Sequence, residues 1–240
     1  MVYQDMYHLI NKPINNDITY VDLLTFLYSY LGKNKINYLE IGVSVLKTFF
    51  QMANFFRESN LYAYDINFIN PMIEKQFNKI NNHEEILEEK SVNQYNFKDN
   101  NIFYFRGDVF KVKQLEKFKN NILDGKVDIL FSDAHHSFEG LMSEYKNLIY
   151  DILSDKFILY YDDLKFHGPT NKRIDMTDAF FLISRELKKK NKNLTVALLD
   201  VNGWLGNHEH KHTNGIITTL NLKQILSQNN INLNIQYFDL

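Results

Sequence analysis

The sequence contains no cysteine, only three prolines, nine glycines and a single tryptophan. Without cysteine the chain cannot form disulfides, use a thiolate in catalysis or hold zinc through sulfur. It also lacks an excess of charge of either sign, because 27 Lys and Arg oppose 29 Asp and Glu for a net charge of −2. This balance gives no general electrostatic reason to expect binding to nucleic acid or to an anionic membrane.

Long hydrophobic runs are missing as well. The apolar stretches are far shorter than the roughly 20 residues that cross a bilayer, so no membrane contact is expected. The first residues, MVYQDMYHLI, have neither a basic region nor a long apolar core, and no signal peptide is expected. We expect a cytoplasmic protein.

What the sequence does contain is enough apolar material for one domain. Its 240 residues, 45% of them hydrophobic, suit one large α/β domain with a sizeable core. No internal repeat and no linker divides the chain. We therefore expect a single domain over residues 1–240, with an N-terminal arm at 1–18, a core at 19–220 and a C-terminal extension at 221–240.

Apolar runs and turn residues predict alternating strands and helices. Seven strands are expected, at residues 37–41, 61–64, 102–105, 127–132, 157–161, 194–201 and 215–220. Helices are expected around them, at 19–31, 45–56, 71–80, 112–120, 138–152, 177–190 and 222–228. The last two strands could pair antiparallel. The polar stretch after residue 80 is interpreted as a solvated surface or a long mobile loop, and residues 234–238 are left unassigned.

Acidic residues stand at the ends of two of these strands. Asp133 follows the strand 127–132, and Asp162 and Asp163 follow the strand 157–161. Neighbouring parallel strands end at the same rim of an α/β sheet, where ligands bind. Carboxylates held together there repel each other unless a cation lies among them, so they predict an oxygen-ligand site for a hard divalent ion such as Mg²⁺. The alternative is that these acids cap the helices or turns that follow.

Histidines accompany the acidic rim. His136, three residues after Asp133, is expected to face the same crevice and to accept a proton, with His135 as the alternative. A second group, which precedes the last strand, is interpreted as a polar turn rather than a metal site. It consists of His208, His210 and His212.

The first strand, helix and strand are typical of a nucleotide-binding unit. Glu40 and Gly42 lie at the end of the strand 37–41, and Asp65 ends the next strand. A glycine turn lets the backbone approach a ligand, and an acid after the second strand can bind ribose hydroxyls. A turn-forming role is the alternative for Asp65.

These motifs resemble the class I S-adenosylmethionine-dependent methyltransferases over residues 19–220. YLEIGVS (38–44) is similar to the family's first motif, Asp65 stands in the place of its ribose-binding acid, and Gly107–Asp108 in that of its adenine-side turn. The resemblance implies a Rossmann-like α/β fold: a seven-stranded, mostly parallel sheet with a C-terminal antiparallel hairpin and helices on both faces. It also implies a set of cofactor-binding residues. They are Glu40, Gly42, Ser44, Asp65, Gly107, Asp108 and Asp133.

Two segments resemble a subgroup, the metal-dependent macrocin and mycinamicin sugar O-methyltransferases, with the cephalosporin-hydroxylase-like proteins beside them. They are DAHHSFEG (133–140) and YYDDL (160–164). This resemblance implies that Asp133, Asp162 and Asp163 hold Mg²⁺. It implies His136 as the base, so that His136 and Asp133 are the catalytic residues. The implied activity is methylation, from S-adenosylmethionine, of a hydroxyl on a sugar or another small polyhydroxylated molecule.

Other functions stay open. A nicotinamide-dependent oxidoreductase could use the same glycine turn, although the acidic rim would have no role in it. Ser44 and Leu46 occupy positions where the family usually has further glycines, and Leu46 keeps open a non-catalytic cofactor-binding module. The acceptor pocket is expected from the arm and the loops 165–174 and 202–214. Aromatic residues of the N-terminal helix could contact a second copy of the chain.

Overall fold

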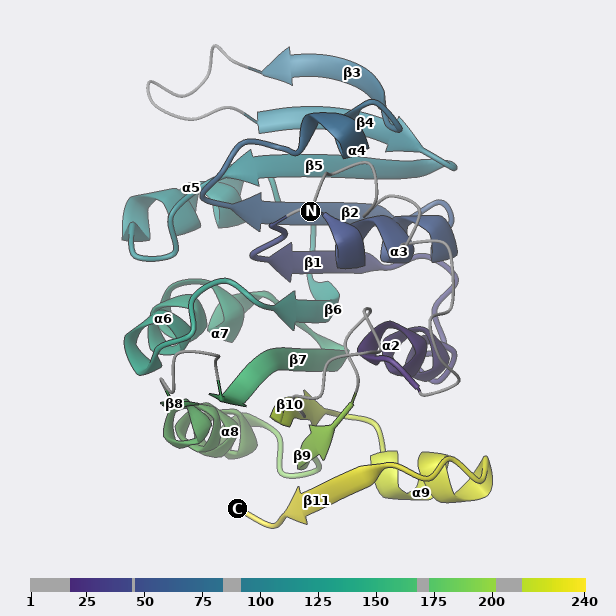
Figure 1. The fold of residues 1–240 in the computed structure, drawn as a ribbon, viewed down its shortest axis with the longest axis vertical. Coiled ribbons are helices and arrows are strands. Elements are labelled where there is room, and N and C mark those ends of the chain that lie inside the picture. Colours follow the sequence, from purple (N-terminus) through teal and green to yellow (C-terminus); the bar gives the residue numbers. More distant parts are fainter. Residues whose placement is uncertain (1–17, 45, 84–91, 168–172, 202–212) are drawn as a thin grey trace.

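One mixed β-sheet runs through the computed structural model, which describes residues 18–44, 46–83, 92–167, 173–201 and 213–240 (Figure 1). Its strand order is β11-β9-β10-β7-β6-β1-β2-β5-β4-β3, and β8 pairs with β7 beside this path. The strands are β1 (Asn37–Ile41), β2 (Asn60–Asp65), β3 (Asn78–His83), β4 (Val92–Phe97), β5 (Asn100–Arg106), β6 (Val127–Ser132), β7 (Leu153–His167), β8 (Arg173–Asp175), β9 (Thr195–Asp200), β10 (Thr213–Thr218) and β11 (Asn234–Phe238).

The centre of the sheet is parallel. β5, β2, β1, β6 and β7 lie side by side in that order, each parallel to its neighbours. They correspond to five of the predicted strands, and β9 and β10 to the other two. The antiparallel pairing expected for these last two is confirmed. Because the five central strands run the same way, their carboxyl ends form one rim, towards which their arrowheads point in Figure 1.

The expected seven-stranded, mostly parallel sheet is too small. Within the described residues the sheet has eleven strands, and antiparallel pairs flank the parallel centre on both sides. Part of the segment interpreted as a solvated loop forms β3 and β4, where Val92 and Tyr95 are buried among polar neighbours. The helix predicted at 71–80 is confined to α4 (Pro71–Glu74). The unassigned residues 234–238 form β11, which pairs with β9.

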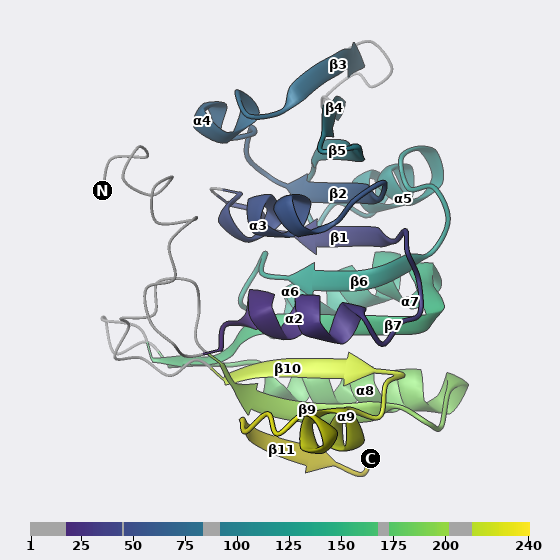
Figure 2. The same ribbon diagram turned by 90° about the vertical axis from the view of Figure 1, so that its right-hand side faces the viewer.

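Helices cover both faces of the sheet, as expected (Figure 2). On one face lie α2 (Tyr20–Tyr28), α3 (Lys47–Phe55), α4 and α9 (Leu222–Gln228). On the other lie α5 (Val112–Asn121), α6 (Phe138–Glu144), the π-helical turn η2 (Tyr145–Ile149), α7 (Tyr150–Ile152) and α8 (Thr177–Lys190). Among the helices of the described ranges, none combines the length and the hydrophobicity that a bilayer span needs.

Local sequence explains how α2 is held on the sheet. Thr19 is its N-cap, and Thr19 and Asp22 form a reciprocal capping box. Tyr20, Leu24 and Leu27 recur at helical spacing and are buried against the sheet. This packing brings the Tyr20 ring to 6.2 Å from the ring of Tyr160 on β7, below the rim.

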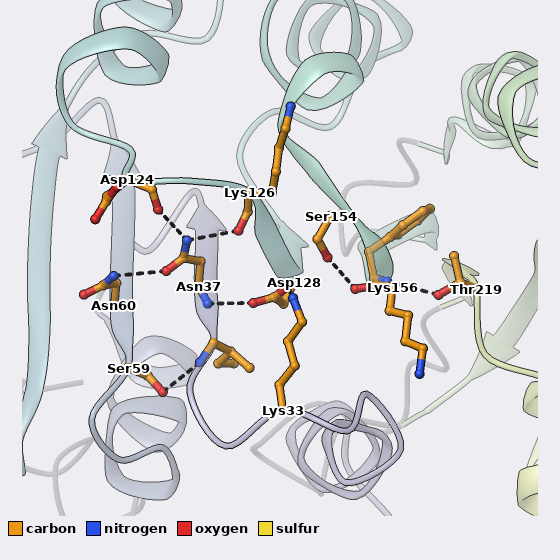
Figure 3. A network of polar contacts seen from close by, with 12 residues as sticks. Lys33, Asn37, Ser59, Asn60, Asp124, Lys126, Asp128, Ser154, Lys156 and Thr219 are labelled. Carbon is orange, nitrogen blue, oxygen red and sulfur yellow. Dashed lines mark hydrogen bonds and ion pairs between the residues drawn. The ribbon is translucent and has the colours of Figure 1, made fainter.

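The amino ends of the central strands are joined by polar side chains (Figure 3). Asp128 on β6 is buried and accepts hydrogen bonds from Lys33 Nζ at 2.5 Å and from the backbone N–H of Asn37 at 2.9 Å. The Asn37 side chain donates to the carbonyls of Asp124 and Lys126 and accepts from Asn60. These bonds align β2, β1 and β6 at the end of the sheet opposite the rim.

Candidate active site at the carboxyl rim

A cavity of about 390 Å³ opens at the carboxyl ends of β1, β2, β5 and β6. Six of the seven residues predicted to bind a cofactor line it. They are Gly42, Ser44, Asp65, Gly107, Asp108 and Asp133. The seventh, Glu40, lies outside the lining. It is buried and accepts a 2.6 Å hydrogen bond from Tyr38 Oη, and burial raises the pKa of its carboxyl well above the usual range.

At Gly42 the backbone of the turn after β1 closely approaches the loop after β6. Its N–H donates to the carbonyl of Tyr64, and the N–H of Asp133 donates to the carbonyl of Ile41, both at 2.8 Å. A Cβ on Gly42 would lie 2.4 Å from the carbonyl oxygen of Asp133 and from Cα of Ala134. Its φ is +84°, which other residues rarely adopt. Glycine is therefore required here by both conformation and space.

Asp65 holds the turn that follows Gly42. Its Oδ2 accepts from the N–H of Ser44 at 2.9 Å, and its Oδ1 accepts from the N–H of Asn67 at 2.7 Å. The second bond is the turn-forming role that the sequence left as an alternative. A carboxylate has about four acceptor positions, so both oxygens keep capacity for a ligand at the cavity wall.

The opposite wall of the cavity is built on the turn after β5. Tyr64 Oη donates to the carbonyl of Asp108 at 3.2 Å and fills the space that a Cβ on Gly107 would need. Asp108 is fixed through its N–H, which donates to Gln114, and through Oδ1, which accepts from Phe110 N–H. Sequence reasoning missed the apolar lining here, Ile66 and Phe110, which are 55% and 44% exposed. Their positions directly after Asp65 and shortly after Asp108 were the available signal.

A second group of side chains adjoins the cavity through Asp133. Ligand atoms of Asp133, His136 and Asp163 all lie within 4.8 Å of one another. His136 Nε2 is 3.0 Å from Asp133 Oδ1. This bond raises the pKa of His136 against the effect of its burial, while burial raises the pKa of Asp133 against the effect of His136. Two carboxylates and an imidazole at this spacing are a donor set that fits a divalent cation.

Asp162, the third predicted cation ligand, is not part of this group. Tyr161 pairs with Gly215 and Lys165 with Thr213, so three residues of β7 bulge opposite the single Asn214 of β10. Within the bulge Asp163 has a left-handed φ of 51°. Its N–H donates to Asn214 Oδ1 at 2.9 Å. Burial raises the pKa of Asp162 well above the usual range, and the charges of Asp133 and Asp163 raise it further.

Lys47 is a residue of the site that sequence reasoning missed. It is the first residue of α3, and its Nζ lies 6.0 Å from the centre of the Tyr20 ring. Burial lowers the pKa of Lys47 to about 8, opposed by nearby carboxylates of which Asp162 acts most strongly and Asp133 next. The amine of Lys47 is therefore within electrostatic reach of the predicted cation ligands. Its signal in the sequence was a lysine five residues after Gly42.

His135, the alternative base, lines the cavity but is not part of the group with Asp133 and Asp163. Its ring meets Phe110 edge-to-face at 4.8 Å, and its Nδ1 is 2.9 Å from Ser137 Oγ. The polar turn with His208, His210 and His212, the arm 1–17 and most of the loop expected to bind the acceptor lie outside the described residues.

Comparison with solved structures shows the fold. No protein-family model and no curated protein matches the sequence. An O-methyltransferase from Bacillus cereus, solved with S-adenosylhomocysteine, is 12% identical over 90% of this chain and 89% of its own, with a TM-score of 0.55. The O-methyltransferase TomG from Streptomyces achromogenes, solved with S-adenosylmethionine, is 8% identical over 90% and 86%, with a TM-score of 0.50. The chain therefore shares the Rossmann-like fold of these methyltransferases.

Proposed function

We propose that this protein is an S-adenosylmethionine-dependent O-methyltransferase that uses a divalent cation, Mg²⁺ by preference. Its acceptor is a hydroxyl of a sugar or of another small polyhydroxylated molecule. The proposal rests on one observation, that Asp133 belongs to two parts of the site. This residue lines the cavity at the strand ends and also belongs to the group with His136 and Asp163. The cofactor pocket and the cation ligands therefore meet at one side chain.

The cavity has the chemistry that an adenosine group needs. Asp65 and Asp108 place carboxylates at its wall, where they can accept hydrogen bonds from ribose hydroxyls and from the adenine amine. Ile66 and Phe110 offer apolar surface to a flat base. The volume of about 390 Å³ lies within the common range of small-molecule sites. The solved methyltransferases of the same fold that carry such a cofactor add support.

The group of Asp133, His136 and Asp163 can assist the deprotonation of a weakly acidic hydroxyl. A cation held by Asp133 and Asp163 would stabilise the negative charge that develops on the acceptor oxygen. If His136 donates from Nε2–H to Asp133, its Nδ1 is left to accept the hydroxyl proton. The methyl group then passes from the sulfonium to the oxygen as the carbon–sulfur bond breaks, which leaves S-adenosylhomocysteine. The sugar acceptor rests on the resemblance of DAHHSFEG and YYDDL to sugar O-methyltransferases.

Calorimetric titration tests the cofactor assignment. We expect the protein to bind S-adenosylhomocysteine with a micromolar Kd, and Asp65→Ala to weaken this binding at least tenfold because the turn at Ser44 and the ribose site lose their carboxylate. Asp155→Asn is the matched control, since Asp155 is exposed and distant from the rim, and it should bind as the parent does.

Two results would contradict the proposed function. Micromolar binding of NAD without any binding of S-adenosylhomocysteine would favour an oxidoreductase. Undiminished methyl transfer to a sugar acceptor after treatment with a chelator would remove the cation from the mechanism.

A further inference from the structure

The proposed function gives Lys47 no task. A lysine at the start of α3 brings a positive charge to the place where the acids are expected to attract a cation. The surroundings of the three acids, Asp133, Asp162 and Asp163, therefore differ in how close each lies to the lysine. Which of them faces Lys47 can be read from the course of β7.

The side chains of β7 alternate between the two cores until the bulge. Tyr160 belongs to the core under α2 and α3, and Tyr161 to the core under α6 and α8. Asp162, two residues after Tyr160, is therefore directed to the α2 and α3 side. The left-handed Asp163 then breaks the alternation, because Leu164 belongs to the second core. The bulge ends the regular alternation between Asp162 and Leu164, so Asp163 is placed by its membership of the group with Asp133 and His136 rather than by strand periodicity.

Lys47 lies on the same side of the sheet as Asp162. The ring of Tyr20 lies close both to Lys47 Nζ and to the ring of Tyr160. Tyr160 precedes Asp162 on the same face of β7. Asp162 is the carboxylate that acts most strongly on Lys47, and it also acts on Tyr20. Asp163, in contrast, shares the group with Asp133 and His136.

We propose that Lys47 is the counter-ion of Asp162, and that the paired acids of β7 have separate tasks: Asp162 holds Lys47, while Asp163 joins Asp133 as a cation ligand. The assignment of Asp163 as a cation ligand rests on the proposed function. Lys47 and Asp162 are positioning residues. Their pair keeps Asp162 away from the cation and fixes the start of α3, and with it the turn at Gly42, against β7.

Two double variants with equal charge separate the tasks. Asp162→Asn/Lys47→Met and Asp163→Asn/Lys47→Met each lose one acid and one base, so both keep the net charge of the parent. Asparagine tolerates the left-handed conformation at position 163. Binding of Mn²⁺ is measured by the loss of the electron paramagnetic resonance signal of the free ion. We expect the first variant to bind within about threefold of the parent, and the second at least tenfold more weakly.

The pair itself is tested by thermal unfolding without added metal. We expect Lys47→Met and Asp162→Asn each to lower the Tm, because each removes one partner of a half-buried pair and leaves the other without it, and the double variant to recover most of the loss. This cycle does not depend on a cation or a methyl donor. Titration of the same proteins with S-adenosylhomocysteine reports separately on the proposed function.

Three outcomes would overturn the proposal. Equal loss of Mn²⁺ affinity in both double variants would make Asp162 a ligand. Unchanged affinity in both would remove Asp163 from the ligands. Additive losses of Tm in the thermal cycle would show that Lys47 and Asp162 are not paired. This result would count even if the parent protein bound no Mn²⁺, because the cycle is measured without metal.

Discussion

At the scale of single residues, the turn after β1 has a left-handed conformation at two residues that are not glycine. Ser44 and Leu46 have φ values of 45° and 61°. This left-handed conformation costs about 1–2 kcal/mol for a residue with a Cβ. The Leu46 side chain is fully buried in the core under α3, which offsets its strain. The sequence thus departs from the glycine-rich pattern in its side chains, whereas the backbone keeps the conformation that glycine favours.

Gly42 is the position in this turn at which no side chain fits. We expect Gly42→Ala to lower the Tm and to weaken the binding of S-adenosylhomocysteine at least tenfold, because a Cβ would force the turn away from Asp133 and Ala134. Gly32→Ala is the matched control. Gly32 also has a positive φ, +70°, but nothing lies within 4 Å of its added Cβ, so only backbone strain of about 1–2 kcal/mol is expected. Equal Tm values for the two variants would show that the close approach at Gly42 is not needed.

At the scale of elements, α6 carries a buried acid beneath the site. Glu144 has no exposed surface, and its Oε2 accepts from Ser132 Oγ at 2.6 Å, whereas Oε1 has no partner among the described residues. Burial raises the pKa of Glu144 to about 8. The π-helical turn η2 begins at the next residue, and such turns often accompany functional sites. The helix therefore braces the last residue of β6, directly before Asp133.

This buried acid predicts a pH dependence of stability. Because the pKa of Glu144 is higher in the folded than in the unfolded chain, its contribution is fully present below about pH 4.5 and is lost as the pH rises towards about 8. Glu144→Gln keeps the acceptor for Ser132 and removes the titration. We expect the Tm of this variant, relative to the parent, to rise between pH 5 and pH 8.

The control for this prediction lies on the same helix. Glu139 is exposed on α6, so Glu139→Gln should leave the difference from the parent constant between the two pH values. Parallel Tm curves for Glu144→Gln and the parent would show that Glu144 is ionised in the folded protein at neutral pH.

At the scale of the whole molecule, the two ends of the central strands have different tasks. The carboxyl ends leave charged and polar groups open to a cavity, and the turn after β1 contains two residues other than glycine with positive φ, Ser44 and Leu46. The amino ends are tied together by the bonds of Asp128, Asn37 and Asn60 (Figure 3). We therefore expect substitutions at the amino ends to change the stability of the fold with little effect on ligand binding at the carboxyl ends.

Asp128→Ala tests this separation. We expect a loss of about 1–3 kcal/mol in the free energy of unfolding, measured in urea, because the N–H of Asn37 loses its buried acceptor. The affinity for S-adenosylhomocysteine should stay within about twofold. Asp151→Ala removes an exposed partner of Lys119 and should cost less than about 1 kcal/mol. A tenfold loss of cofactor affinity in Asp128→Ala would show that the two ends of the sheet are coupled.

The sequence by itself determined the seven main strands, most of the helices around them and most of the rim. Apolar runs of strand and helix length identify buried elements, and parallel strands necessarily end on one edge. Residues far apart in the chain, such as Gly42, Asp65, Asp108 and Asp133, could therefore be predicted to meet at one cavity, and they do.

Only the tertiary structure decided what depends on neighbouring elements. β3, β4 and β11 mix polar and apolar residues and are placed by pairing with β4, β5 and β9, respectively, which local sequence does not show. The break in the alternation of β7 after Asp162 arises from a bulge opposite Asn214, a residue of another strand. Lys47 lies near Tyr20, whose ring lies near that of Tyr160 on β7, because α2 and α3 contact each other on one face of the sheet. Each of these features is set by contacts between segments distant in sequence, and strand and helix periodicity carries no information about such contacts.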